Sequence, residues 1–276
     1  MEIEELVRSL SPNATLKDIS AGGNKVYRLL EEDGATSILK IYNGPSRERR
    51  ERHALEALAG VVGVPAIIDR GNTEGSSWIR MTDGGTWDLA SLPRNLDIVR
   101  SAGRVLRGVH ESNVQLTNLA HSIDDDNIEA HYNSTLARLE RFRRRLTIPP
   151  DLLEAARAAG SPHASSPRPA HTRPTPEQFL VTEAGQVTLI DWGWATMAPP
   201  EWDVSLASWQ LANLLGDQAA AAFIEGYGAA VSAARLRPWI AYHAAMIMLD
   251  MAEQRDGRLH DLAPMVRAMG DAVGFA

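Results

Sequence analysis

The amino-acid sequence predicts an α+β protein of two lobes, a small β-rich lobe followed by a larger helical lobe. Through most of the first ninety residues apolar and polar residues follow the period of strands, and beyond them helical periods dominate. Between the two patterns the sequence DGGT, residues 83–86, breaks the chain with two glycines. We therefore expect domains at 1–83 and 84–276, with a ligand-binding cleft between them.

The small lobe is predicted to be a sheet with one helix. Asp33-Gly34 separates two extended runs, which is a hairpin signal. The run SRERRERHALEALAG, residues 46–60, has a helical period and stops at Gly60. Strands are expected within 16–20, 25–32, 33–44 and 64–82.

The larger lobe is predicted to be mainly helical. One short strand pair, within 177–181 and 186–190, interrupts the helices. Residues 160–176 are rich in Pro and Ser and are expected to be loop. Helices are expected over 94–111, 127–146, 150–159, 202–214, 216–232 and 237–255.

Composition narrows the class of protein. The chain of 276 residues is 44% hydrophobic and 23% charged, an ordinary globular balance. No apolar run is long enough for a membrane span, and the start MEIEELVRSL does not resemble a secretory signal. The absence of cysteine removes disulfides and thiolate sites and fits a cytoplasmic protein. A net charge of −7 argues against nucleic acid as the main partner.

Lys40 and an acidic residue of the first helix are predicted to form an ion pair. Ile38, Lys40 and Tyr42 share one face of a strand. Glu51 lies three and four residues before Ala54 and Leu55, so it shares the apolar face of the helix. Its carboxylate is therefore expected to point inward and to need a cation. Glu48, one turn earlier, is the alternative partner; for either residue a solvated surface position stays possible.

Two further segments could hold a nucleotide. Gly22, Gly23 and Asn24 form a turn between strands where the backbone could approach a phosphate closely, although most such turns are structural. Asp191 ends the buried strand QVTLI and precedes Trp192 and Gly193. A carboxylate held at a strand end suits a nucleotide-bound Mg²⁺, and a turn-capping role is the alternative.

Taken in order, these segments resemble the aminoglycoside phosphotransferase and choline kinase family, which has a protein-kinase-like fold. The resemblance lies in AGGNKVYRL, SILKIY, RRERHALEALAGVVGVPAII and LIDWGWATMAPPEWDVS, and spans about residues 16–255. It implies ATP and Mg²⁺ as cofactors, Lys40 at the α- and β-phosphates, and adenine against the backbone near Met81, Thr82 and Asp83. It also implies Asp191 as metal ligand, with Pro200 and Asp203 in a structural motif.

The catalytic loop departs from the family pattern of His-Gly-Asp, four residues and Asn. Here His171 matches the His, Thr172 stands for Gly, Arg173 for the catalytic Asp, and Gln178 for the metal-binding Asn. Arg173 cannot accept a proton from a substrate hydroxyl. We expect Arg173 to project into the cleft where Asp191 meets the phosphate. Glu177 and His171 are the nearby substitutes for a base, and the alternatives are a solvated loop residue for Glu177 and a structural role, bonded to the backbone, for His171.

Two functions follow from this departure. The first is an ATP-dependent phosphotransferase acting on a hydroxyl of a small metabolite or of a peptide Ser or Thr. The second is a pseudokinase that binds nucleotide and holds a protein partner, for example an enzyme of peptide tailoring. The acidic run Asp124–Asp126 could hold a cationic substrate or merely favour a helix N-terminus. The basic run Arg138–Arg145 could dock an acidic partner or be a solvated helix face.

Overall fold

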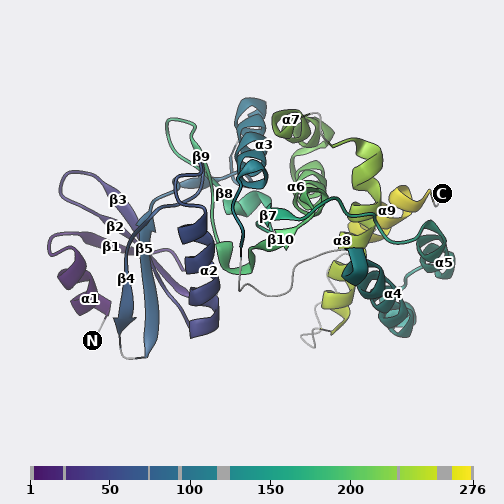
Figure 1. Cartoon of the computed structure of the whole chain (residues 1–276), viewed down its shortest axis with the longest axis horizontal. Helices are drawn as coiled ribbons and strands as arrows, with labels where there is room; N and C mark the ends of the chain where they lie inside the picture. The colour runs from purple at the N-terminus through teal and green to yellow at the C-terminus, as the bar shows by residue number, and fades with distance from the viewer. Residues whose placement is uncertain are drawn as a thin grey trace.

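The computed structural model describes residues 3–20, 23–73, 75–92, 95–116, 125–228, 231–253 and 263–274. It is an α+β structure of two lobes, with a five-stranded antiparallel sheet at one end and a helical lobe at the other (Figure 1). In the part of the chain that is described, no helix is long and apolar enough to cross a membrane.

The small lobe is a sheet covered on both faces. Its strand order is β1-β2-β3-β5-β4. Helix α1 packs on one face through Leu6 and Val7, and α2 lies on the other face through Leu55. The bounds are α1 Ile3–Leu10, β1 Thr15–Asp18, β2 Lys25–Leu30, β3 Thr36–Ile41, α2 Pro45–Ala57, β4 Ile67–Thr73 and β5 Ser76–Thr82.

The predicted hairpin is confirmed. Strands β2 and β3 pair with Leu30 opposite Thr36, and Gly34 in the turn has a φ of 84°. The register also places Val26 opposite Lys40 and Arg28 opposite Ile38. Because side chains alternate between the two faces of a sheet, these four residues point to the same side, toward the large lobe.

The large lobe contains two small sheets among helices. Strands β6, β8 and β9 form one, and β7 pairs with β10 in the other. The strand bounds are β6 Trp87–Asp88, β7 Arg168–Ala170, β8 Phe179–Val181, β9 Val187–Leu189 and β10 Thr196–Ala198, and the 3₁₀ turns are η1 Pro176–Gln178 and η2 Trp192–Trp194. The helices are α3 Leu96–Glu111, α4 Asp125–Leu146, α5 Pro150–Ala159, α6 Pro200–Leu215, α7 Asp217–Tyr227, α8 Ala233–Glu253 and α9 Ala263–Val273.

Three sequence-based expectations for this lobe are wrong in detail. The segment 160–176 is not loop throughout, because β7 pairs with β10 there. The helix expected over 216–232 ends at Tyr227, before Gly228. The helix expected from 237 begins at Ala233, and Pro238 lies inside it. Helix α9 was not expected at all.

One apolar core joins the two lobes. It combines Leu55, Leu58 and Ile79 of the small lobe with Phe179 and Trp192 of the large lobe. A second core fills the far end of the large lobe, between α4, α5, α6, α8 and α9. The first core therefore fixes α2 against η2, next to the segment that carries Asp191.

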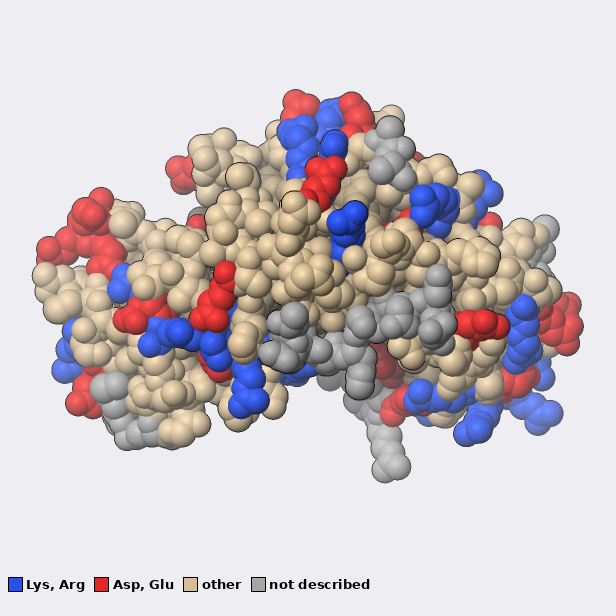
Figure 2. All heavy atoms as spheres, viewed as in Figure 1, with Lys and Arg blue, Asp and Glu red and all other residues tan. Residues whose placement is uncertain are grey.

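Basic side chains lie over α2 and over the α4–α5 end of the molecule on the face shown in Figure 2. In the predicted basic run, Arg138 pairs with Glu253 and Arg143 pairs with Glu140, which also contacts Arg157 of α5. These exposed pairs fit the interpretation of a solvated helix face. The side chains of the acidic run Asp124–Asp126 lie outside the described residues.

Candidate functional site

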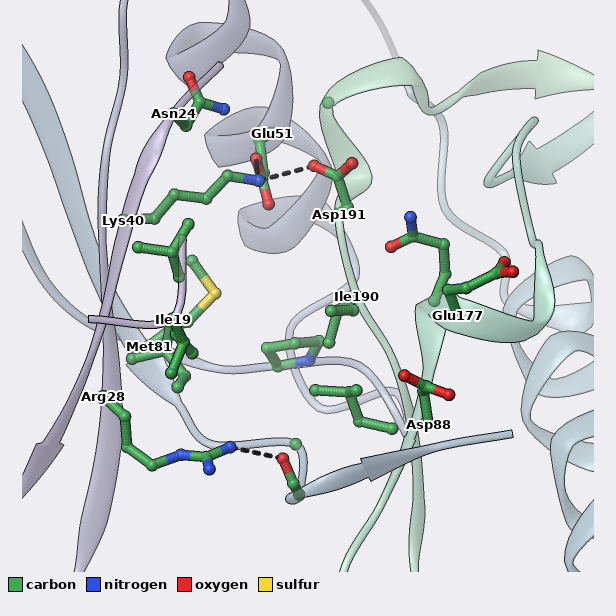
Figure 3. Close-up of a pocket in the computed structure, with 18 of the residues that line it drawn as sticks. Ile19, Asn24, Arg28, Lys40, Glu51, Met81, Asp88, Glu177, Ile190 and Asp191 are labelled. Atoms are coloured by element: carbon green, nitrogen blue, oxygen red, sulfur yellow. Dashed lines mark hydrogen bonds and ion pairs between the residues drawn. The ribbon is translucent and has the colours of Figure 1, made fainter. Parts of the chain in front are cut away.

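A cleft of about 700 Å³ lies between the five-stranded sheet and the β6–β8–β9 sheet. Ile19 and Met81 from the small lobe face Ile190 from the large lobe across its middle (Figure 3), and Val26, Ile38 and Leu180 also line it. Apolar walls on both sides of a slot of this size suit a flat ring. Arg28 and Asp88 lie at one end of the slot, and Lys40, Glu51 and Asp191 gather at the other, which we call the charged end (Figure 3).

Lys40 joins the two lobes at that end. Its ammonium lies 2.7 Å from the Glu51 carboxylate and 2.6 Å from the Asp191 carboxylate (Figure 3). Lys40 and Glu51 are only 8% and 2% exposed. Burial alone would lower the pKa of Lys40, but the two carboxylates outweigh it and the pKa is raised. Lys40 is therefore a fixed cation inside the cleft.

The predicted choice of Glu51 over Glu48 is confirmed. Glu51 sits among the buried residues of α2, with Ala54 and Leu55. Burial raises the pKa of Glu51, and the Lys40 ammonium offsets part of this effect. Glu48 instead receives a 2.8 Å contact from Arg52, one turn along the same helix.

Asp191 is presented to the cleft by an unusual backbone conformation. It follows β9 with φ 66° and ψ 59°, in the left-handed region, and η2 begins directly after it. Its side chain is 44% exposed. Burial would raise the pKa of this carboxyl, but the adjacent Lys40 ammonium more than offsets this and the pKa is lowered. The side chain is thus an ionised oxygen donor with an open side.

The loop around His171 is held by Asp203. The fully buried Asp203 carboxylate accepts hydrogen bonds from the backbone amides of His171 at 2.7 Å and Thr172 at 2.8 Å. Thr172 has a φ of 68°, which suits its place where the family pattern has Gly. Asp203 therefore fixes the backbone of His171 and Thr172, the two residues that match the start of the family's catalytic loop. This is a structural role, as the resemblance implies.

His171 serves the packing of this loop. Its side chain is fully buried, its Nε2 donates to the Ile190 carbonyl at 2.8 Å, and burial lowers its pKa. A side chain without solvent access does not meet a substrate hydroxyl in this arrangement. Of the two alternative bases, this leaves Glu177, which lines the cleft.

Arg173 does not point where the sequence suggested. It is exposed and absent from the cleft lining, and its guanidinium lies over the Trp194 ring, 4.4 Å from the centroid. The expectation that it projects between Asp191 and a phosphate is therefore wrong for this arrangement. The reason is local: the Trp194 ring offers the cation a stacking surface outside the slot.

The remaining predicted residues fall into three groups. Gly23, Asn24, Met81, Thr82, Glu177 and Gln178 line the cleft. Gly22 lies outside the described residues. Asp83 does not line the cleft, because its carboxylate is paired with Arg28 at 2.6 Å and accepts from the Gly85 amide.

Sequence reasoning missed several cleft residues. Arg28 lines the cleft and ties β2 to the segment after β5 through Asp83 and the Gly85 carbonyl (Figure 3). Strand alternation alone places Arg28 on the same face as Val26, so this residue could have been found. Asp88, Arg47 and Trp194 also line the cleft, and no sequence pattern pointed to them.

Comparison with known proteins shows the family of this chain. The sequence pattern of the phosphotransferase enzyme family (APH) matches residues 15–239, so the chain belongs to that family. No curated protein matched the sequence.

Solved structures with this fold include several phosphotransferases. An apo thermostable mutant of the aminoglycoside phosphotransferase APH(4)-Ia superposes with a TM-score of 0.68 at 16% identity, covering 98% of each chain. A choline/ethanolamine kinase family protein from Mesorhizobium loti has a TM-score of 0.66 at 18% identity, covering 94% of this chain and 87% of the other. Spectinomycin phosphotransferase APH(9)-Ia, solved with ADP and spectinomycin, has a TM-score of 0.64 at 14% identity, covering 100% and 97%.

Proposed function

We propose that this protein is an ATP-dependent phosphotransferase that transfers the γ-phosphate to a hydroxyl group. The observation that carries the proposal is Lys40, which contacts Glu51 at 2.7 Å and Asp191 at 2.6 Å across the charged end of the cleft. A buried lysine fixed by a helix carboxylate is the arrangement that kinases use to hold nucleotide phosphates. The nucleotide complex of the similar spectinomycin phosphotransferase adds support.

The nucleotide base would occupy the apolar slot. Ile38, Met81 and Ile190 offer apolar walls, and Thr82 and Gly84 line the edge of the cleft. The Thr188 side chain packs closely against Gly84, since a Cβ added there would lie 3.0 Å from it. We place the adenine at this edge and the phosphates beside Lys40, Gly23 and Asn24.

The residues present fit a Mg²⁺ site. Asp191 offers an open carboxylate and Gln178, which lines the same cleft, offers an amide oxygen. Among the described residues no group of three or more His, Asp or Glu could hold a metal. Mg²⁺ in such sites takes one or two protein oxygens and completes its shell with phosphate and water, so two donors suffice. When bound, the ion would neutralise charge on the phosphates.

Glu177 is the proposed general base. It lines the cleft directly before Gln178 and is exposed, and its carboxylate is turned away from Asp191 in Figure 3. It would have to change rotamer to meet an acceptor hydroxyl beside the nucleotide. A general base contributes about 10²–10⁴-fold, so a poorly placed base gives a slow enzyme, not an inactive one.

A nucleotide-dependent binding protein is the second candidate, and it is favoured by Arg173. No carboxylate stands at this position of the loop, and the arginine stacks outside the slot. Under this alternative the cleft binds Mg·ATP and the complex holds a partner protein without transferring phosphate.

The test combines nucleotide binding with label transfer. Purified protein is titrated with Mg·ATP by calorimetry and then incubated with γ-labelled ATP and a panel of hydroxyl compounds and Ser/Thr peptides. We expect binding and transfer in the wild type, loss of binding in Lys40→Ala and loss of transfer in Asp191→Ala. Absence of binding at millimolar nucleotide overturns both candidates. Binding without transfer or hydrolysis, with activity appearing in Arg173→Asp, selects the binding protein.

A further inference from the structure

Trp194 carries two cations at the charged end of the cleft. It is the last residue of η2, is 39% exposed and lines the cleft. The Arg50 guanidinium from α2 lies 4.9 Å from its ring centroid, and the Arg173 guanidinium from the loop lies 4.4 Å from it. One ring therefore collects a cation from each lobe.

Neither guanidinium is neutralised. Among the described residues, Arg50 and Arg173 have no salt-bridge partner, whereas Arg52 on the same helix pairs with Glu48 and Glu56. The Nε of Arg50 is buried and makes no hydrogen bond. Both charges lie near one centroid, within about 10 Å of each other, which is roughly the Debye length at 0.1 M salt. Two unpaired cations at this separation repel each other, and a bound anion would relieve the repulsion.

A third arginine, Arg47, lies on the inside of the cleft. Arg47 lines the cleft, and one of its terminal nitrogens lies 3.7 Å from where a Cβ on Gly23 would be. Arg47 and Lys40 thus place their positive charges inside the slot. Arg50 and Arg173 are not part of its lining. The whole chain has a net charge of −7, so this positive end does not follow from composition.

We propose that Arg50 and Arg173, stacked on Trp194, bind an oxyanion of the acceptor, so that the acceptor is an acidic hydroxyl compound and not a cation. This rests on the proposed phosphotransferase function. A planar guanidinium stacked on an aromatic ring keeps its edge N–H groups free, and these bind carboxylate or phosphate bidentately. Arg173, which stands where the family pattern has the catalytic Asp, would then help to select an acceptor that carries a negative charge.

The experiment uses inorganic phosphate and malonate as probes of the two oxyanions. Each is titrated by calorimetry, at constant ionic strength, into three forms of the full chain: nucleotide-free, Mg·ADP-bound and Mg·AMP-PNP-bound. AMP-PNP fills the γ-phosphate position, so an anion that still binds must lie beyond it. We expect at least one of the probes to bind the AMP-PNP form.

Variants assign the binding to the two arginines. Arg50→Gln and Arg173→Gln should each weaken the probe about tenfold or more, the loss of one charge-assisted hydrogen bond. Arg173→Lys should weaken it less, because it keeps the charge without the planar fork. Arg49→Gln is the matched control: Arg49 is exposed on the same helix and should leave probe affinity unchanged. Thermal unfolding checks that all variants fold.

Each other outcome counts against the proposal in a different way. Binding to the ADP form but not the AMP-PNP form would assign the arginines to the γ-phosphate. Equal affinity in all variants, or no binding by either probe, would leave the stack as a surface feature only. Failure of AMP-PNP itself to bind would overturn the proposed function, while the nucleotide-free titration would still report on the arginines.

Discussion

Asp203 holds the backbone of Thr172 in a conformation that a β-branched residue rarely adopts. The carboxylate accepts from the Thr172 amide at 2.8 Å, and the residue has a φ of 68°. The second carboxylate oxygen accepts from the His171 amide at 2.7 Å and lies 3.1 Å from Nε2 of His110. A single buried carboxylate therefore fixes the loop, and α3 is connected to it through His110.

Replacing Asp203 with Asn should destabilise the whole protein. The substitution removes the negative charge and turns an amide N–H₂ toward groups that donate. Breaking a buried charged network of this kind costs about 3–5 kcal/mol, so urea unfolding should shift by a large part of the total stability. Asp97→Asn is the control, since Asp97 is exposed and its change should stay within about 0.5 kcal/mol. A small effect at Asp203 would mean that the loop at His171 and Thr172 keeps its conformation without this carboxylate.

Glu51→Gln should weaken nucleotide use while Glu48→Gln should not. Without the Glu51 charge, Lys40 keeps only Asp191 and turns toward it, away from the phosphates. We expect kcat/KM for ATP to fall about tenfold or more, as for one lost charged hydrogen bond. Glu48→Gln removes a partly buried pair with Arg52 that lies away from Lys40, and Arg52 keeps its pair with Glu56, so kcat/KM should change less than about twofold. Equal effects of the two substitutions would contradict this assignment of Glu51.

Two glycines of α3 should respond to alanine in opposite directions. A Cβ on Gly103 would lie 2.2 Å from the Phe223 carbonyl oxygen, so Gly103→Ala forces α3 and α7 apart and should cost about 1–3 kcal/mol. A Cβ on Gly108 meets no atom within 4 Å, and Gly108→Ala should stabilise by up to about 1 kcal/mol through helix propensity. Thermal unfolding of both variants decides the matter. Stabilisation by Gly103→Ala would show that these helices pack less closely.

His243 should make the protein sensitive to acid. Burial lowers the pKa of His243 to about 4, while the unfolded residue titrates near 6.5. The unfolded state therefore binds this proton first, and the contribution present above pH 6.5 is lost as pH falls to about 4. The loss is about 3 kcal/mol at most.

Urea unfolding of His243→Gln between pH 7 and 4.5 measures this contribution. The variant should be less stable at pH 7, since His243 packs on Trp202, but its stability should fall less steeply with acid. His163→Gln, which replaces an exposed histidine, should keep the acid slope of the wild type. If the slope of His243→Gln also stays unchanged, other groups carry the acid sensitivity.

The parts of the site that lie on regular structure could be predicted from the sequence. Strand alternation placed Lys40, and the apolar stripe of α2 separated Glu51 from Glu48. Arg173 could not be placed this way, because a loop side chain follows whatever surface lies within reach, here Trp194. Strands β7 and β10 have three residues each, too few for a periodic signal within a Pro-rich segment.

The apolar core that runs from Leu55 through Phe179 to Trp192 links binding to global folding. A domain boundary near residue 83 suggests two units, yet neither lobe could bury these side chains alone. We expect one cooperative unfolding transition for both lobes, and an expressed small lobe that aggregates through the exposed face of α2. We therefore expect the cleft to open only by a small sliding of α2 along η2 and not by a large rotation of the two lobes.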